Sequence, residues 1–303
     1  MAHYWSDYIQ TTEELYASRD NRFHESNKEI WMQQIGVSSG MKVLEVGCAG
    51  GTFCHKLKEY IPDLDITGLD KDKDHIAFAI RKAEELGLDV KFVEGDIGNL
   101  PFADETFDLV FSYTVAEHVP PDDFYKEQQR VLKPGGRMTV LSVRTGLSLK
   151  DREDENISDE EMALMEKLWS GAEPIFEKYG VGKYEMEEHE FPRKLAEYGF
   201  RQVDVQIFSL MEYSPDSASV SDEEAIRQIE NRRIMSLNQM KKGMRLAPGI
   251  LSEHEAEELA CRINRRFDRR VEKYKRGIAL WDFASSTVLA VSGRKMWKEQ
   301  GIW

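Results

Sequence analysis

The chain has 303 residues, of which 41% are hydrophobic and 32% are charged, an ordinary composition for a soluble globular protein. No stretch approaches the ~20 consecutive apolar residues of a membrane span, and the first residues lack the basic and apolar regions of a signal peptide. The formal net charge of −14 disfavours a general nucleic-acid binder, because so negative a surface repels phosphate backbones.

The N-terminal segment is polar and carries several aromatic side chains. Its pattern predicts two short helices, at about residues 12–18 and 24–35. We expect these helices to form a lid. The aromatic residues Tyr4, Trp5 and Tyr8 either stack on a substrate or only dock the terminus, and the second interpretation is the more common one for such clusters.

From Met41 onward, strands and helices alternate. Five short apolar runs have the composition of strands, and the segments between them have the length of helices. Strands that alternate with such helices form a parallel sheet with helices on both faces. The five predicted strands cover residues 41–46, 65–69, 90–93, 107–112 and 137–143.

The alternation stops after the fifth strand. Ser158, Ser221 and Ser252 are each followed three residues later by glutamate, a pattern that begins helices. Two further alternating runs predict a sixth strand at residues 201–208 and a seventh at 287–291. The long segment between these two strands is mostly helical, and we expect it to fold over the sheet edge as a cap.

The first predicted strand ends in a glycine-rich turn that opens a helix. Glycines allow the backbone to come close to a ligand, and the following helix N-terminus offers unpaired N–H groups. An ordinary tight turn has the same composition, so further support is needed. Asp70 ends the second strand about twenty-five residues after Glu45, where a carboxylate can accept both hydroxyls of a ribose. Asp96 follows the third strand and either contacts a ligand or only forms a turn after Gly95.

Four segments in this order and spacing resemble the successive motifs of class I S-adenosylmethionine (SAM)-dependent methyltransferases. The resemblance covers about residues 40–145 and is greatest to the branch that includes ubiquinone- and menaquinone-biosynthesis methyltransferases. It implies an α/β fold with a doubly wound, mostly parallel seven-stranded sheet whose last strand is antiparallel. It also implies SAM as cofactor, S-adenosylhomocysteine as product and no metal. The four segments are VLEVGCAGG, GLD, EGDIGNLPFADETFDLVFS and LKPGGR.

The resemblance assigns residues to parts of the cofactor. Glu45 would lie near the methionine amino group, Asp70 would hold the ribose, and Asp96 with Ile97 would hold the adenine. Ser112 would sit beside the methionine end. The complete cofactor set is Glu45, Gly47, Cys48, Ala49, Gly51, Asp70, Lys71, Asp96, Ile97 and Ser112.

Ala49 departs from the family pattern, which more often has glycine at this position. Its methyl group is tolerable if φ is negative. The turn also lacks the second glycine of G-x-G-x-x-G, and neither Asp96 nor the LKPGG segment has a role in a nicotinamide-binding domain. A dehydrogenase is therefore excluded.

Together these patterns divide the chain into four expected regions. The core would bind SAM, and the other regions would surround it. They are an N-terminal helical lid at 1–39, a SAM-binding core at 40–211 with a helical insertion at about 150–190, a helical cap insertion at 212–283, and the final core strand with the C-terminus at 284–303.

Catalysis requires mainly that the acceptor, the methyl group and the sulfur be aligned, since a methyl sulfonium is already activated. Residues 112–118 follow the fourth strand and lie at the substrate edge of such a sheet. His118 is the first candidate for a general base, because its ordinary pKa of ~6.5 suits proton transfer near neutrality. Packing in a loop is the alternative interpretation of His118. Glu117 and Tyr113 are weaker candidates.

Basic residues gather late in the helix that begins after Ser252. Either they complement the helix dipole, or Arg266 and Arg269 recognise an anionic group of the substrate. The acidic run around His189 lacks the spacing of a metal site and predicts an exposed surface.

The predicted function is methyl transfer from SAM to a small molecule, which could be anionic. Methylation of RNA or protein and a non-catalytic SAM-binding regulatory role are the alternatives. The net charge opposes RNA, and Ser112-Tyr113-Thr114-Val115 replaces the Asn/Asp-Pro-Pro-aromatic motif of amino-methylating nucleic-acid enzymes. Three cysteines without disulfide or metal spacing predict a cytoplasmic protein.

Overall fold

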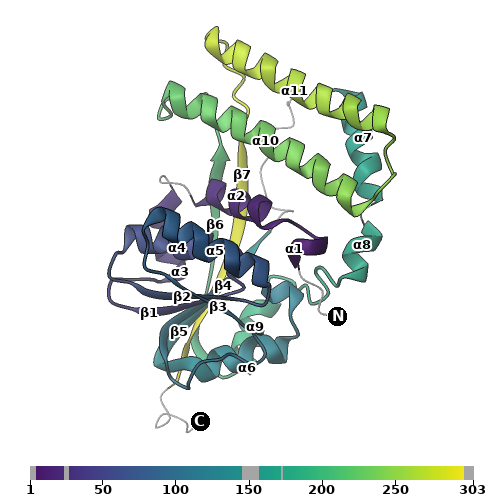
Figure 1. Ribbon diagram of the computed structural model, residues 1–303. Helices are drawn as coiled ribbons and strands as arrows, with labels where there is room; N and C mark the ends of the chain where they lie inside the picture. Colours follow the sequence, from purple (N-terminus) through teal and green to yellow (C-terminus); the bar gives the residue numbers. More distant parts are fainter. Residues whose placement is uncertain (1–4, 24–26, 145–156, 172, 297–303) are drawn as a thin grey trace.

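The computed structural model of the chain describes residues 5–23, 27–144, 157–171 and 173–296, in which a seven-stranded sheet has helices on both faces (Figure 1). The strand order is β3-β2-β1-β4-β5-β7-β6. The pairs among β1 to β5 are parallel, and β7 runs antiparallel to both β5 and β6. The predicted fold class is confirmed. The strands are β1 (Lys42–Val46), β2 (Asp65–Asp70), β3 (Lys91–Glu94), β4 (Phe107–Tyr113), β5 (Leu132–Val143), β6 (Phe200–Tyr213) and β7 (Ala284–Lys295).

The direction in which the sheet is built reverses at β1. The chain extends from β1 through β2 to β3, and then returns to place β4 on the other side of β1. Val43 therefore pairs with Ile66 of β2 on one side and with Leu109 of β4 on the other. At such a reversal the loops after the two central strands diverge and leave a crevice at the carboxyl edge, where ligands of open α/β sheets bind.

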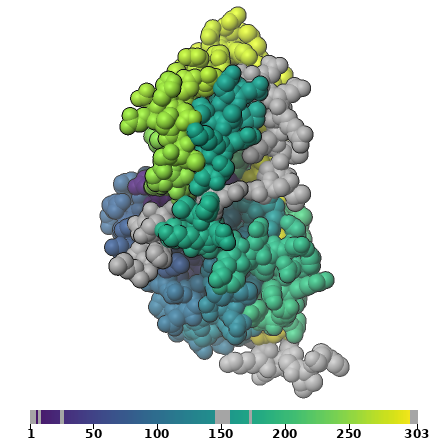
Figure 2. Space-filling model, turned by 90° about the vertical axis from the view of Figure 1, so that its right-hand side faces the viewer, coloured from purple at the N-terminus to yellow at the C-terminus, as the bar shows by residue number. Residues whose placement is uncertain are grey.

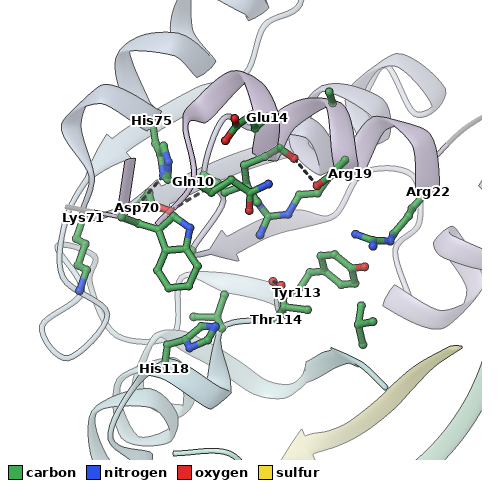
Figure 3. Close-up of a pocket in the computed structure, with 18 of the residues that line it drawn as sticks. Gln10, Glu14, Arg19, Arg22, Asp70, Lys71, His75, Tyr113, Thr114 and His118 are labelled. Atoms are coloured by element: carbon green, nitrogen blue, oxygen red, sulfur yellow. Dashed lines mark hydrogen bonds and ion pairs between the residues drawn. The ribbon is translucent and has the colours of Figure 1, made fainter. Parts of the chain in front are cut away.

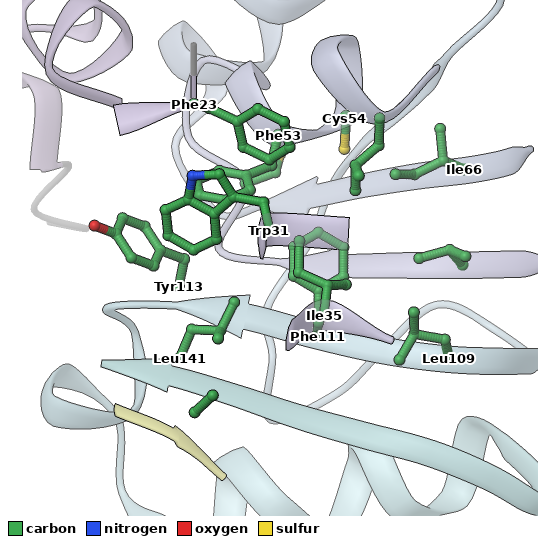
Figure 4. Packing of buried hydrophobic residues seen from close by; sticks show 14 of the residues in the cluster. Phe23, Trp31, Ile35, Phe53, Cys54, Ile66, Leu109, Phe111, Tyr113 and Leu141 are labelled. Atoms are coloured by element: carbon green, nitrogen blue, oxygen red, sulfur yellow. The ribbon is translucent and has the colours of Figure 1, made fainter. Parts of the chain in front are cut away.

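Apolar clusters hold the core helices on the two faces of the sheet. On one face Trp31 is fully buried, and its ring meets Phe53 edge-on at 4.9 Å and lies parallel to Phe23 at 5.6 Å (Figure 4). On the other face Phe124 and Phe191 dock helices α6 and α9. The core helices are α3 (Lys28–Ile35), α4 (Thr52–Tyr60), α5 (Lys73–Leu86), α6 (Pro121–Val131) and α9 (Glu190–Glu197).

A third apolar cluster builds a separate cap above the core (Figures 1 and 2). Helices α10 (Asp222–Leu246) and α11 (Glu253–Lys275) come between β6 and β7 in the chain, and α7 (Asp159–Ser170) packs on both of them. The short α8 (Glu173–Lys178) follows α7. The last two strands are longer than predicted, because their pairing continues past the sheet into the cap, where Tyr213 and Ala284 are buried.

Helices α1 (Trp5–Tyr8) and α2 (Thr12–Arg22) lie between the core and the cap (Figure 1). Helix α2 begins at a capping box formed by Thr11 and Glu14 and extends four residues beyond the predicted end. Arg22 forms an ion pair with Glu212 of β6 at 2.6 Å, so α2 is fastened to the sheet. Tyr4, one of the aromatic residues singled out in the sequence, lies outside the described residues.

The two arginines for which substrate recognition was one of two interpretations lie on α11 of the cap and do not line the cavity at the sheet edge. Arg266 is buried and donates from Nε and Nη2 to the carboxylate of Glu161, with the shortest distance 2.9 Å. Ser158 caps α7 as predicted, since its side chain accepts the N–H of Glu161. The side chain of Glu161 bonds to Arg266 and so joins α7 to α11. Arg269 is exposed. The spacing of the basic residues correctly predicted one helical face, but part of that face packs against α7.

We expect Arg266→Ala to lower the free energy of unfolding by about 3–5 kcal/mol, because it leaves the buried Glu161 carboxylate without its partner. The exposed Arg269→Ala is the control and should change stability by less than about 0.5 kcal/mol. Urea denaturation of both variants measures the difference. Equal effects of the two substitutions would contradict a structural role for Arg266.

Candidate functional site

The turn after β1 is fastened to the end of β2. The backbone N–H groups of Gly47 and Cys48 both donate to the carbonyl oxygen of Leu69, at 2.8 and 3.0 Å. Gly47 has φ of +68°, and a Cβ there would lie 2.5 Å from the side chain of Val115. Gly51 has φ of +80°. Conformation and packing therefore both require glycine at 47, and the turn is held against the loop that follows β4.

Ala49 adopts the left-handed conformation, with φ of +48°. We expected the methyl group of Ala49 to be tolerable if φ were negative, but φ is positive. This conformation costs a non-glycine residue roughly 1–2 kcal/mol. The N–H group of Ala49 donates to Asp70 Oδ2 at 2.8 Å, and that hydrogen bond helps to hold the strained residue in place.

The carboxylate of Asp70 joins the glycine turn to the beginning of the next helical segment. Besides the bond from Ala49, its Oδ1 accepts the N–H of Asp72 at 2.9 Å, and His75 Nδ1 lies 3.7 Å away. A carboxylate has about four lone-pair sites, so Asp70 can still accept hydroxyl groups from a ligand.

A cavity of about 630 Å³ opens at the carboxyl edge of the sheet (Figure 3). Its floor is formed by the strand ends and their loops, and its walls are formed by α2 of the N-terminal segment and α10 of the cap. The predicted residues that line it come from four different strand ends. They are Gly47, Ala49, Asp70, Lys71, Asp96, Ile97, Tyr113 and His118.

The other predicted core residues lie outside this lining and support it from behind. Cys48 and Ser112 are fully buried. Glu45 is also buried, and its carboxylate accepts a hydrogen bond from Cys54 Sγ at 2.9 Å. Burial raises the pKa of Glu45 to about 7. Glu117 and Gly51 likewise do not line the cavity.

Tyr113 ends β4 and lines the cavity. Its ring packs edge-on against Trp31 at 5.5 Å, and within the described part of the chain its buried hydroxyl has no hydrogen-bond partner. Burial raises the pKa of the Tyr113 phenol, although the nearby guanidinium groups of Arg22 and Arg19 act in the opposite direction. The hydroxyl is therefore neutral near pH 7 and can donate to a ligand.

His118 also lines the cavity, but its geometry speaks against the general-base role. Its Nδ1 accepts the backbone N–H of Gly182 at 3.0 Å, which assigns the ring proton to Nε2. Burial, with Lys71 and Arg19 nearby, lowers the pKa of His118 to about 4. An imidazole that carries its proton on the free nitrogen donates a hydrogen bond rather than accepting a proton.

Glu117, the neighbouring candidate, does not line the cavity, and its side chain bonds to the sheet. Its carboxylate accepts a hydrogen bond from the hydroxyl of Ser142 on β5. Its backbone carbonyl accepts from the N–H of Tyr184, and burial raises the pKa of its side chain. These contacts give Glu117 a structural role in holding the loop after β4.

Sequence reasoning expected a helical lid and a helical cap over the sheet edge, but it did not identify the residues through which α2 and α10 line the cavity. Arg19 and Arg22 project from α2, and Figure 3 shows them on the side opposite Thr114 and His118. One face of α10 supplies three carboxamides, two apolar side chains and one ammonium group. These residues recur at helical spacing, which is the signal that could have identified them: Asn231, Ile234, Met235, Asn238, Gln239 and Lys242.

Neither a membrane span nor a metal centre is found in the part of the chain that the structure describes. No helix there is long and apolar enough to cross a membrane. No group of three or more His, Cys, Asp or Glu side chains is arranged there to hold a metal ion.

A family model described as a methyltransferase domain matches residues 37–199, more than half of the chain. The chain belongs to this family. The matched residues contain the glycine turn, the strand ends that carry Asp70 and Asp96, and the loop after β4. The predicted relationship to class I SAM-dependent methyltransferases is thereby confirmed.

Curated relatives of this methyltransferase chain match mainly over the core. A sterol 24-C-methyltransferase of Gibberella zeae is 29% identical over 175 residues, which are 57% of the chain and 45% of that protein. A fatty-acid O-methyltransferase of Mycolicibacterium smegmatis is 39% identical over 107 residues, or 35% of the chain and 38% of that protein. The chain thus spans less than half the length of these relatives.

A solved structure is similar in fold over nearly all of the chain. Phosphoethanolamine N-methyltransferase 2 of Haemonchus contortus, in complex with S-adenosyl-L-methionine, has a TM-score of 0.53 and 17% identity. The alignment covers 97% of this chain and 59% of that one. At this identity the likeness shows the shared fold alone.

We expect Ala49→Gly to stabilise the methyltransferase by up to about 1 kcal/mol, because glycine adopts positive φ without strain. Ala77→Gly, the same change at an exposed position within α5, should destabilise by about 1 kcal/mol. Thermal or urea unfolding of both variants measures the contrast. Destabilisation by both changes would mean that Ala49 is not strained.

The lowered pKa of His118 predicts a pH-dependent stability. Between pH 4 and 6.5 the unfolded chain binds a proton at His118 that the folded chain does not, so this contribution is present above pH 6.5 and is lost toward pH 4. His118→Asn, whose side-chain oxygen can replace Nδ1, should flatten the slope of unfolding free energy against pH by up to about 1.4 kcal/mol per pH unit. The exposed His254→Asn is the control. An unchanged slope in His118→Asn would contradict the neutral, buried imidazole.

Proposed function

We propose that this chain transfers a methyl group from SAM to a small-molecule acceptor. One observation carries the proposal: predicted cofactor residues from separate strand ends line a single cavity, which continues between α2 and α10. The strand ends supply acidic and backbone groups, whereas α10 supplies amide and apolar groups. Such a division suits a polar cofactor on the floor and an acceptor against the helices.

The residues present fit the parts of SAM. Asp70, with Lys71 beside it, would hold the ribose, and Asp96 with Ile97 would hold the adenine. The Gly47–Gly51 turn, including Cys48 and Ala49, would pass along the cofactor, with Glu45 and Ser112 supporting its methionine end from behind. Bound SAM would supply a methyl group on a positively charged sulfur. The protein would mainly orient the acceptor toward it, a contribution that can reach ~7–11 kcal/mol of a barrier.

Hydrogen-bond donors dominate the cavity near the loop after β4. The Tyr113 hydroxyl and the protonated Nε2 of His118 would hold a polar atom of the acceptor, not remove its proton. This arrangement suits an acceptor whose nucleophile needs no strong base, such as an ionised oxygen or an electron-rich carbon. Tyr113 and His118 would then be catalytic through orientation, and Glu117 would position their loop.

The acceptor we propose is a small molecule with an apolar part and a polar end. Ile234 and Met235 of α10 offer apolar contact, and Asn238 offers an amide about one helical turn away. Relatives whose names specify sterols and fatty acids support an acceptor of this kind. RNA or protein methylation and a purely regulatory role gain no comparable support. We further propose a cytoplasmic location, which the free thiols of Cys48, Cys54 and Cys261 support.

Calorimetry with S-adenosylhomocysteine tests cofactor binding. We expect Asp70→Asn to weaken binding by about 10- to 100-fold, because it removes charge-assisted hydrogen bonds to the ribose. The exposed Asp74→Asn on α5 should leave the affinity unchanged. Failure of the unmodified protein to bind S-adenosylhomocysteine would refute the proposed function.

Transfer itself can be measured with labelled SAM and a panel of fatty acids, sterols and other small amphiphiles, with RNA as the comparison. We expect label in a small-molecule fraction. We also expect Asn238→Leu, which changes only the wall of the cap, to alter the KM for the acceptor more than the affinity for S-adenosylhomocysteine. Labelled RNA or protein without labelled small molecules would contradict the assignment of acceptor.

A further inference from the structure

Arg19 is a buried cation in the wall of the cavity. It projects from the last turn of α2, its exposed fraction is only 7%, and it lines the cavity (Figure 3). Its Nη1 is fully buried and has no hydrogen-bond partner among the described residues. Buried guanidinium groups are normally paired, since removing such a charge from water without a partner is strongly unfavourable.

Arg22 provides the contrast, one helical turn further along α2. It is also close to Tyr113, but it forms a 2.6 Å ion pair with Glu212 of β6. Arg22 therefore fastens α2 to the sheet. Among the described residues Arg19 forms no ion pair, and its guanidinium only faces the Tyr113 ring, 5.8 Å from the ring centre, so an anchoring role like that of Arg22 does not explain its place in the cavity wall.

The surroundings of Arg19 identify the end of the cavity to which it belongs. Its guanidinium lies 5.8 Å from the centre of the Tyr113 ring at the end of β4, and the nearby acidic groups that act on it are Glu45 at the end of β1 and Asp70 at the end of β2. Glu45 is not a full counter-ion, because burial raises its pKa to about 7 and Cys54 already donates to its carboxylate. Arg19 thus lies above the β1–β4 crevice, on the methionine side of a cofactor whose ribose is held by Asp70.

We propose that Arg19 binds the carboxylate of the methionine part of SAM, and that this contact couples cofactor binding to the closure of α2 over the cavity. The inference rests on the proposed function. A guanidinium presents parallel N–H donors that match a carboxylate, and the ligand would provide the missing partner of the buried cation. Helix α2 also contacts α10, through an ion pair between Glu14 and Arg245 at 3.3 Å. Binding of the carboxylate at Arg19 would therefore also position α10, which forms the cavity wall proposed to contact the acceptor.

A comparison of two ligands isolates the carboxylate. SAM and decarboxylated SAM differ only in that group, and calorimetry can measure the affinity of each without any acceptor. We expect the unmodified protein to bind SAM about 10- to 100-fold more tightly than decarboxylated SAM. Arg19→Met, which keeps the length and apolar contacts of the side chain, should abolish this preference by weakening SAM binding alone. Arg227→Met, at an exposed position of α10, is the control and should retain the preference.

Stability without ligand supplies a second readout. If the partner of Arg19 is a ligand, Arg19→Met should leave the melting temperature of the free protein unchanged or raise it. The same substitution should reduce the increase in melting temperature that SAM produces. A structural role would instead lower the melting temperature of the free protein. Arg19→Lys, which keeps the charge without the paired donors, should recover only part of the preference for SAM.

The outcomes separate this inference from the proposed function. If the unmodified protein binds neither ligand, the proposed function fails. If it binds SAM but Arg19→Met keeps the preference for the carboxylate, or loses affinity equally for both ligands, the assignment of Arg19 is overturned while the proposed function stands. An anionic acceptor as the true partner of Arg19 would give the unchanged preference.

Discussion

The attachment of the glycine turn to the end of β2 determines the geometry of the whole site. Two N–H groups of the turn converge on one carbonyl oxygen, that of Leu69, and the carboxylate of Asp70 holds the next residue of the turn. The parallel ladder already brings the ends of β1 and β2 together, where Val46 pairs with Leu69, and this small set of bonds then positions the turn over that edge. Every other part of the cavity is built relative to that pair, and Ala49 is kept in an unfavourable conformation to preserve it.

Buried arginines differ in their partners: those of the cap form ion pairs with carboxylates of the protein, whereas Arg19 at the sheet edge forms none among the described residues. In the cap, Arg266 meets Glu161, and Arg270 meets Asp216 and Asp282 at 2.7 and 2.8 Å. Arg266 thereby joins α11 to α7, and Arg270 joins α11 to the segments that follow β6 and precede β7, although Arg270 Nη1 has no hydrogen-bond partner among the described residues. At the sheet edge, the Arg19 Nη1 and the Tyr113 hydroxyl are buried and have no hydrogen-bond partner within the part of the chain that the structure describes. Arg19 and Tyr113 line the cavity whereas Arg266 and Arg270 do not, and a carboxylate of the protein in the cavity would compete with a ligand for Arg19.

The sequence sufficed to predict the core because its signals are local. Strand ends, glycines and carboxylates follow one another at short spacing, and parallel strands necessarily bring their carboxyl ends together. The roles of Arg19, Arg266 and the amide face of α10 were beyond such reasoning, because they depend on which elements pack against one another across long stretches of sequence. Helical spacing predicts that residues share a face, but not whether that face meets solvent, another helix or a cavity. His118 shows the same limit, because its tautomer depends on the backbone of Gly182.

The pairing of Tyr213 with Ala284 has a consequence for how this protein can change over evolution. These residues begin and end the segment that carries α10 and α11, and they are neighbours on adjacent strands. The segment therefore enters and leaves through one narrow stem, and the entropic cost of closing it grows only slowly with its length, by about 0.6 kcal/mol for each doubling. Substitutions in the segment between Tyr213 and Ala284 can change the shape of one side of the cavity and leave the strand ends in place. The same holds if the segment is exchanged as a whole between related enzymes. Diversity of acceptors and constancy of the methyl donor can thus coexist in one scaffold.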